Sequence, residues 1–165
     1  MSSTDLLLDN AGRYAAAFDK GDLPQRPALR VAVVTCMDAR LNPSALLGLG
    51  EGDAHVIRNA GGLVTDDAIR SLTISQRLLS TEEIVVIHHT GCGLRTFSDE
   101  EFRDQIQAET GIRPPWAAET LGEIDEDVRR GIARIQDSPF IPVKSSVRGF
   151  VYDVDNGTLR EVEPA

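Results

Sequence analysis

The chain has 165 residues, of which 41% are hydrophobic and 26% charged, and its formal net charge at pH 7 is −9. These values predict one soluble globular domain, and the acidic balance argues against nucleic acid and anionic membranes as partners, because both attract clustered Lys and Arg. The chain has no apolar run of about 18 residues, no basic leader with a cleavage signal and only two cysteines, so we expect a protein of the reducing cytoplasm.

The first predicted element is a helix over residues 4–19, in which polar and apolar positions alternate at helical spacing. Ser3 or Thr4 is expected to cap its start, and Lys20-Gly21 to mark its end. Its apolar face must be buried, either on the chain's own domain or on a partner subunit. The pattern alone leaves both arrangements open.

Three strands are predicted in the first half of the chain, and the first and third are expected to be buried, because short β-branched apolar runs are typical of parallel sheets. They cover residues 30–36, 54–58 and 83–88. Helices are expected between them. One begins at Asn42-Pro43, with proline at the first helical position, and the other covers residues 66–79 behind a Thr65 cap.

The second half of the chain continues with helices and then closes with strands. A capping box of Ser98 and Glu101 opens one helix, and another is predicted over residues 119–136. A strand over 147–154 then turns at Asn156-Gly157 into 159–162. The predicted fold is therefore α/β: a mostly parallel central sheet flanked by helices, with an N-terminal helix and a C-terminal antiparallel hairpin, in one domain over residues 1–165.

Both cysteines lie in compact polar clusters at the ends of predicted strands. The clusters are Cys36-Met37-Asp38-Ala39-Arg40 and His88-His89-Thr90-Gly91-Cys92-Gly93. Parallel sheets bind ligands at the carboxyl ends of their strands, so the two clusters converge if the first and third strands are neighbours.

Two thiolates and one imidazole are a donor set that suits zinc, and three protein ligands leave one position open for catalysis. A tight turn at Gly91 lets His89 and Cys92 face one ion, with Cys36 as the third ligand. Adjacent strand residues point to opposite faces, so only one imidazole of the pair should reach the metal, and the spacing favours His89 over His88.

Asp38 has two alternative roles in such a centre. It is either the fourth ligand, which closes the site, or the acceptor of a hydrogen bond from metal-bound water, held in place by a bidentate pair with Arg40. A dithiol redox pair would need Cys-x-x-Cys, which is absent. Three other residues are expected to be structural: His55, Phe97 and Trp116.

Cys36-x-Asp38-x-Arg40, followed by His89-x-x-Cys92-Gly93, resembles the β-class carbonic anhydrases, in particular their compact bacterial members. The similarity extends through the segment from Glu51 to Gly61 and, in the order of elements, over the whole chain.

The resemblance implies one Zn²⁺ per subunit on Cys36, His89 and Cys92, with Asp38 and Arg40 as the catalytic pair. It implies reversible hydration of CO₂ to bicarbonate and a proton by zinc-bound hydroxide. It also implies a dimer or tetramer, with residues 1–27 as an arm on the partner. Two alternatives remain on the same scaffold: a zinc hydrolase of carbonyl sulfide (COS) or carbon disulfide (CS₂), and a non-catalytic zinc protein.

Overall fold

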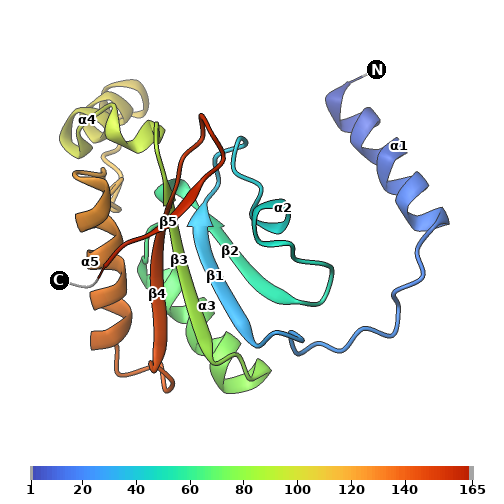
Figure 1. Ribbon diagram of the computed structural model, residues 1–165. Coiled ribbons are helices and arrows are strands. Elements are labelled where there is room, and N and C mark those ends of the chain that lie inside the picture. Colours follow the sequence, from blue (N-terminus) through green and yellow to red (C-terminus); the bar gives the residue numbers. More distant parts are fainter. Residues whose placement is uncertain (1, 164–165) are drawn as a thin grey trace.

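The computed structural model describes residues 2–163 and is built around a five-stranded sheet in the order β2-β1-β3-β4-β5 (Figure 1). Its strands are β1 (Val31–Cys36), β2 (Ala54–Asn59), β3 (Glu83–His89), β4 (Ser146–Tyr152) and β5 (Leu159–Glu161). Strands β1 to β4 run parallel to one another, and β5 runs antiparallel to β4. The predicted α/β class and the terminal antiparallel element are confirmed.

The described residues also form five α-helices and two short 3₁₀ turns. They are α1 (Ser3–Ala16), α2 (Pro43–Leu47), α3 (Asp66–Leu79), α4 (Asp99–Thr110), α5 (Ile124–Asp137), η1 (Ala60–Gly62) and η2 (Gly93–Arg95). Thr65 caps α3 and Ser98 forms a capping box with Glu101 at α4, both as predicted. None of the described helices combines the length and the apolar character that a membrane crossing requires.

The central strands β1 and β3 are buried on both faces, which is why their sequences are almost continuously apolar. On one face, Leu72 of α3 and Ile135 of α5 pack with Val34 of β1. On the other face, Val33 and Ile87 pack with Leu41, which lies just before α2. Each fully buried aliphatic side chain contributes about 1.5–3 kcal/mol. The carboxyl ends of β1 and β3 are thereby held side by side.

Two helix boundaries differ from the prediction. Helix α1 is capped by Ser2 rather than by Ser3 or Thr4, and it ends at Ala16, because a turn and irregular chain replace its last predicted turn. Helix α5 begins at Ile124 behind a Glu123 cap, five residues later than predicted. Glu119 has a left-handed backbone (φ 54°), which a right-handed helix cannot include.

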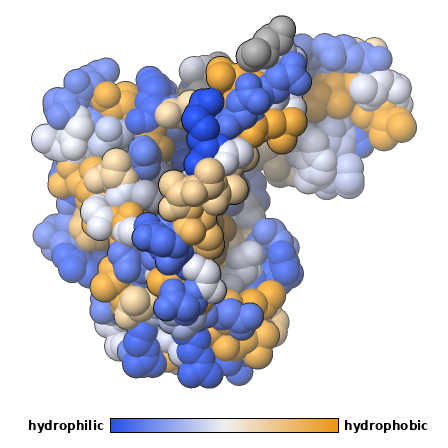
Figure 2. All heavy atoms as spheres, turned by 90° about the vertical axis from the view of Figure 1, so that its right-hand side faces the viewer, coloured by the Kyte–Doolittle hydropathy of each residue, from blue (hydrophilic) through white to orange (hydrophobic). Residues whose placement is uncertain are grey.

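Helix α1 lies apart from the sheet and its helices (Figure 1), and none of its residues is buried. Tyr14 and Lys20 reach Glu51 of the main body, at 2.5 Å each. Apolar side chains on this segment stay open: Leu7 is 64% exposed, Leu8 65% and Phe18 50%. The view from this side shows orange apolar side chains among blue hydrophilic ones (Figure 2).

Candidate metal centre

The two polar clusters of the sequence come together at one edge of the sheet. Strands β1 and β3 are adjacent and parallel, with Thr35 opposite Ile87, so Cys36 ends one strand close to where His89 ends the other. Cys92 follows in the turn that leads into η2. One ligand atom from each of Cys36, His89 and Cys92 lies within 4.8 Å of the others, and all three residues are buried. The convergence inferred from the sequence is therefore present.

The two histidines of β3 differ as the alternation of a strand requires. His89 Nδ1 lies 2.8 Å from the carbonyl oxygen of Thr90, which can only accept, so Nδ1 carries the proton. Its Nε2 is buried without a hydrogen-bond partner among the described residues. His88 is 1% exposed and outside the cluster, and burial lowers its pKa to about 4. His89, and not His88, presents a lone pair to the two thiols.

The thiols have different environments. Burial raises the pKa of Cys36, but the adjacent His89 imidazole and two backbone N–H groups together outweigh burial and lower that pKa to about 7. Burial raises the pKa of Cys92, with a further rise from the nearby Cys36. The pKa of His89 is raised: burial lowers it, but Cys36, the Thr90 carbonyl and Asp38 together raise it by more. The cluster therefore favours a cation in its middle.

The donor set fits zinc. Ligands at about 2.3 Å (sulfur) and about 2.0–2.1 Å (nitrogen) from a tetrahedral ion lie less than about 4 Å from each other. The spacing of at most 4.8 Å among the three ligand atoms can close to that range with small side-chain adjustments. The contact between His89 Nδ1 and the Thr90 carbonyl fixes the ring with Nε2 inward, as outer hydrogen bonds do in metal sites.

Gly62 packs η1 directly against the backbone of the first ligand. Its φ is +69°, and a Cβ on it would lie 2.7 Å from Cys36 N and 2.9 Å from Thr35 C. Only glycine permits both this conformation and this approach. The backbone position of Cys36 is thus set by a neighbouring turn as well as by the β1 ladder.

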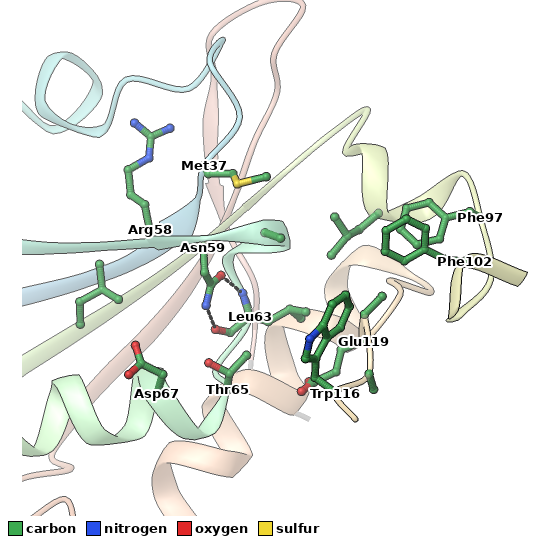
Figure 3. Close-up of a pocket in the computed structure, with 15 residues that line it drawn as sticks. Met37, Arg58, Asn59, Leu63, Thr65, Asp67, Phe97, Phe102, Trp116 and Glu119 are labelled. Atoms are coloured by element: carbon green, nitrogen blue, oxygen red, sulfur yellow. Dashed lines mark hydrogen bonds between the residues drawn. The ribbon is translucent and has the colours of Figure 1, made fainter. Parts of the chain in front are cut away.

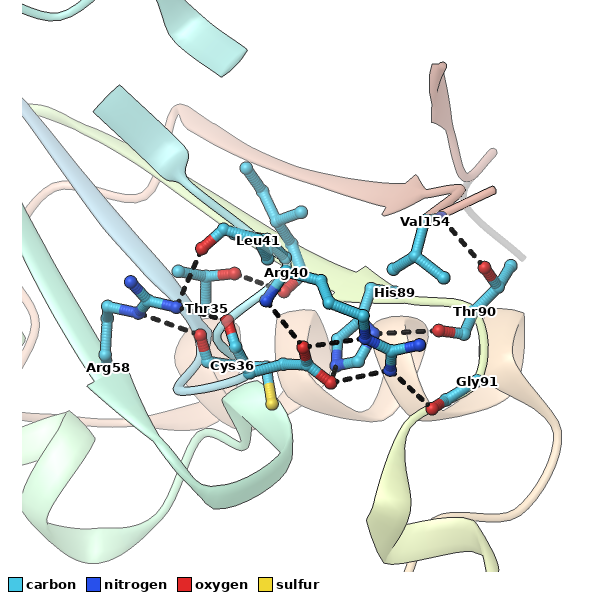
Figure 4. A network of polar contacts seen from close by, with 11 residues as sticks. Thr35, Cys36, Arg40, Leu41, Arg58, His89, Thr90, Gly91 and Val154 are labelled. Atoms are coloured by element: carbon cyan, nitrogen blue, oxygen red, sulfur yellow. Dashed lines mark hydrogen bonds and ion pairs between the residues drawn. The ribbon is translucent and has the colours of Figure 1, made fainter. Parts of the chain in front are cut away.

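Asp38 and Arg40 form the bidentate pair that the sequence suggested (Figure 4). Arg40 Nε donates to Asp38 Oδ1 at 3.0 Å and Nη2 to Oδ2 at 2.7 Å, and the Arg40 backbone N–H adds a third bond at 2.9 Å. These bonds hold the pKa of Asp38 well below its usual range, so the carboxylate is ionised. Its Oδ2 lies 3.7 Å from His89 Nε2, at the border of the ligand cluster.

Arg40 also joins the two loops of the site. Its Nη2 donates to the carbonyl oxygen of Gly91 at 2.9 Å, in the turn between His89 and Cys92. The guanidinium therefore links the loop after β1 with the loop after β3. The sequence suggested the pair with Asp38 but gave no sign of this bond.

An apolar cavity of about 480 Å³ is lined in part by residues that are near two of the ligands in the sequence (Figure 3). Met37 and Leu94, which come shortly after the ligands Cys36 and Cys92, line it. Phe102 lies between Phe97 and Trp116, with ring centroids 5.1 Å and 6.4 Å away. All three rings also line the cavity, so Phe97 and Trp116 form one of its walls in addition to packing together.

His55 and Arg58 are both outside the ligand cluster. His55 lies outside the cluster, where its Nδ1 shares a hydrogen bond of 2.7 Å with Ser75 Oγ. Arg58, at the end of β2, bonds to the loop that carries Asp38. The sequence analysis did not single out Arg58, although an arginine at the end of a predicted strand was a visible signal.

Comparison with known proteins agrees with this geometry. A family model described as carbonic anhydrase matches residues 31–119. The "Beta-carbonic anhydrase 1" of Mycobacterium tuberculosis is 54% identical over 99% of this chain and 100% of its own length. The crystal structure of a carbonic anhydrase from Streptococcus mutans covers 99% of both chains at 45% identity and a TM-score of 0.92. A "Carbon disulfide hydrolase" of Acidianus sp. is 35% identical over 80% of this chain and 76% of its own.

Proposed function

Because the chain belongs to the β-class carbonic anhydrase family, we propose that it catalyses the reversible hydration of carbon dioxide to bicarbonate and a proton. One observation carries the proposal: an ionised, bidentately held Asp38 borders a buried cluster of two thiols and one imidazole. That combination supplies a metal site and a fixed hydrogen-bond acceptor beside it.

The proposed cofactor is one zinc ion per chain, held by Cys36, His89 and Cys92. Zinc with three protein ligands supplies a Lewis acid that lowers the pKa of water and so provides a nucleophile near neutral pH. Both cysteines are free thiols. A reducing compartment keeps such thiols available for metal, which supports the proposed cytoplasmic location.

Asp38 is the proposed catalytic acceptor. An ionised carboxylate only accepts hydrogen bonds, so it orients an O–H group of the nucleophile and leaves the lone pair of that oxygen free to face the substrate carbon. Arg40 engages both oxygens of Asp38, and this supports the role of acceptor over that of fourth metal ligand. Arg40 itself positions the carboxylate and keeps it charged.

The apolar cavity suits the substrate. Carbon dioxide is linear, apolar and uncharged, and the cavity beside Met37 and Leu94 is walled mainly by apolar and aromatic side chains. Such a wall favours an uncharged gas over water and ions. We expect substrate to reach the metal centre from this side.

Stopped-flow CO₂ hydration on the zinc-loaded protein, from pH 6.5 to 9, tests the proposal. Asp38→Asn should keep its zinc and lose about 10²–10⁴-fold in kcat/KM, the range expected for a positioned acid–base group. Asp125→Asn is the matched control, because Asp125 is also held bidentately by an arginine, Arg160, away from the site. A zinc-loaded chain with no rate above buffer would refute the function, and zinc loss in Asp38→Asn would favour a closed, non-catalytic site.

A second candidate function is hydrolysis of carbon disulfide or carbonyl sulfide. Curated carbon disulfide hydrolases share 31–35% identity with this chain, and both gases are linear and apolar like CO₂. Sulfide release from either gas on the same zinc-loaded protein measures this activity. Release faster than CO₂ hydration would make it the main reaction.

The proposed assembly is a dimer or tetramer of one domain, in which residues 1–27 form an arm on a neighbouring copy. The support is that α1 buries none of its residues within its own chain, although Leu7 and Leu8 are apolar and mostly exposed. Sedimentation at micromolar concentration should show the oligomer, and joint Leu7→Glu and Leu8→Glu substitution should weaken it. Ile112→Glu, at another exposed apolar residue, is the control. A monomeric unmodified chain would refute the arrangement.

A further inference from the structure

Arg58 is the second-to-last residue of β2 and donates three hydrogen bonds to one short segment of main chain (Figure 4). Its Nε donates to the carbonyl oxygen of Cys36 at 2.9 Å. Its Nη2 donates to the carbonyl oxygens of Asp38 and Leu41, at 2.8 Å each. All three acceptors belong to the loop that contains the first metal ligand and the catalytic pair.

Few main-chain hydrogen bonds fix the shape of this loop, and its other anchors are the bond from Arg40 Nη2 to Gly91 O and the buried side chain of Leu41. Residues 37–42 form no helix or strand. Apart from the pair of Asp38 and Arg40, the main-chain bonds that hold the loop are Met37 N to Asn59 O at 2.8 Å and Leu41 N to Asp38 O at 3.1 Å. Carbonyl groups in such a segment need donors, and here one planar guanidinium serves three of them.

The bonds of Arg58 also tie the loop to a rigid element. Cys36 lies opposite Asn59 in the parallel register of β1 and β2, so Arg58 reaches the loop from the strand that already pairs with its first residue. Figure 4 shows Arg58 on one side of the loop and Arg40 on the other. Arg58 forms no ion pair within residues 2–163, and the hydrogen bonds of its Nε and Nη2 all go to these three carbonyls.

We propose that Arg58 is a positioning residue of the metal centre. By fixing the carbonyls of Cys36, Asp38 and Leu41 at once, it keeps the Cys36 thiolate directed at the metal while the Asp38 carboxylate faces the nucleophile. The inference deepens the proposed function, since it concerns the same site. It predicts that both metal affinity and turnover depend on a residue that is no metal ligand, although Arg58 also lines the cavity proposed for the substrate.

The forked shape of the Arg58 guanidinium, with donors on separate nitrogens, is essential to the proposed positioning role. A lysine at position 58 would keep the positive charge but offers a single nitrogen at the end of its chain, which cannot donate from two separate positions as Nε and Nη2 of Arg58 do. Arg58→Met keeps most of the length and removes all the donors. Comparing the two variants therefore separates geometry from charge.

The experiment measures zinc affinity, by competition with a chromophoric chelator, together with kcat and KM for CO₂ hydration. Arg58→Met should weaken zinc binding about 10–100-fold and lower kcat with little change in KM, as loss of an outer support does at metal sites. Arg58→Lys should recover only part of either loss. Arg77→Met is the control, because Arg77 also donates to one main-chain carbonyl, that of Phe140, away from the site.

If these variants are unstable, chemical rescue tests the role of Arg58 in a different way. Methylguanidine added to Arg58→Ala should raise its kcat and zinc affinity, and should leave the unmodified chain unchanged. Circular dichroism establishes that each variant is folded. A merely structural arginine would lower the melting temperature without a response to methylguanidine.

Three results would overturn the inference: zinc affinity and kcat of Arg58→Met within about twofold of the unmodified chain, full recovery by lysine, or an equal loss in Arg77→Met. The zinc-affinity measurement does not depend on catalysis. If the unmodified chain binds zinc but hydrates no CO₂, the proposed function fails while the role of Arg58 is still decided.

Discussion

Replacing Gly62 with alanine tests how strongly the backbone around the first ligand is constrained. The added Cβ would meet only backbone atoms: Cys36 N at 2.7 Å, Thr35 C at 2.9 Å and Ile87 O at 3.1 Å. These atoms belong to the two central strands and cannot turn away as the end of a flexible side chain would. Either η1 or the end of β1 must move.

The magnitude has two parts. A left-handed backbone at φ +69° costs a residue with a Cβ about 1–2 kcal/mol. Forcing a methyl group into well-packed surroundings costs about 1–3 kcal/mol more. Gly62→Ala should therefore lower the free energy of unfolding by about 2–5 kcal/mol. It should also weaken zinc binding, because relief of the contact displaces Cys36.

Gly48 provides a matched control for the conformational part. Its φ is +67°, and a Cβ there would have nothing within 4 Å. Gly48→Ala should cost only the backbone penalty of about 1–2 kcal/mol and leave zinc affinity unchanged. Urea unfolding and zinc competition on both variants make the comparison. If the two unfolding free energies agree within about 0.5 kcal/mol, the close packing of η1 on Cys36 is not a real constraint.

Further predictions concern the proposed metal ligands and the proposed catalytic pair. His89→Ala should lose stoichiometric zinc by elemental analysis. His88→Ala should keep it while losing about 1–3 kcal/mol of stability, because His88 is a buried residue outside the cluster. Arg40→Gln should retain zinc and lower kcat/KM about 10–100-fold, and zinc loss or an unchanged rate would contradict its positioning role. The apparent zinc affinity should fall as the pH is lowered through 7. The reason is that Cys36 (pKa about 7) and Cys92 (raised pKa) must both lose a proton to bind the metal. A flat pH profile in chelator competition would argue against two thiolate ligands.

Features of the sequence that act over a few residues were sufficient to predict most elements. Valine-rich runs located β1 and β3, and the caps at Thr65 and Ser98 located the starts of α3 and α4. The start of α5 was predicted too early, because apolar spacing continues through a segment whose backbone is not helical at Glu119. Periodicity does not register a single residue with positive φ.

The sequence by itself determined the chemistry of the site: two thiols, an imidazole, a carboxylate and a guanidinium at the ends of two strands, and which histidine faces the metal. Strand alternation and short residue spacings are local properties, so they can be recognised in the sequence alone. Only the tertiary structure decided that β1 and β3 are neighbours, that Arg40 reaches Gly91, and that Arg58 reaches the loop from β2. These contacts join residues between 17 and 52 positions apart, and the packing of the whole sheet decides them rather than any local pattern.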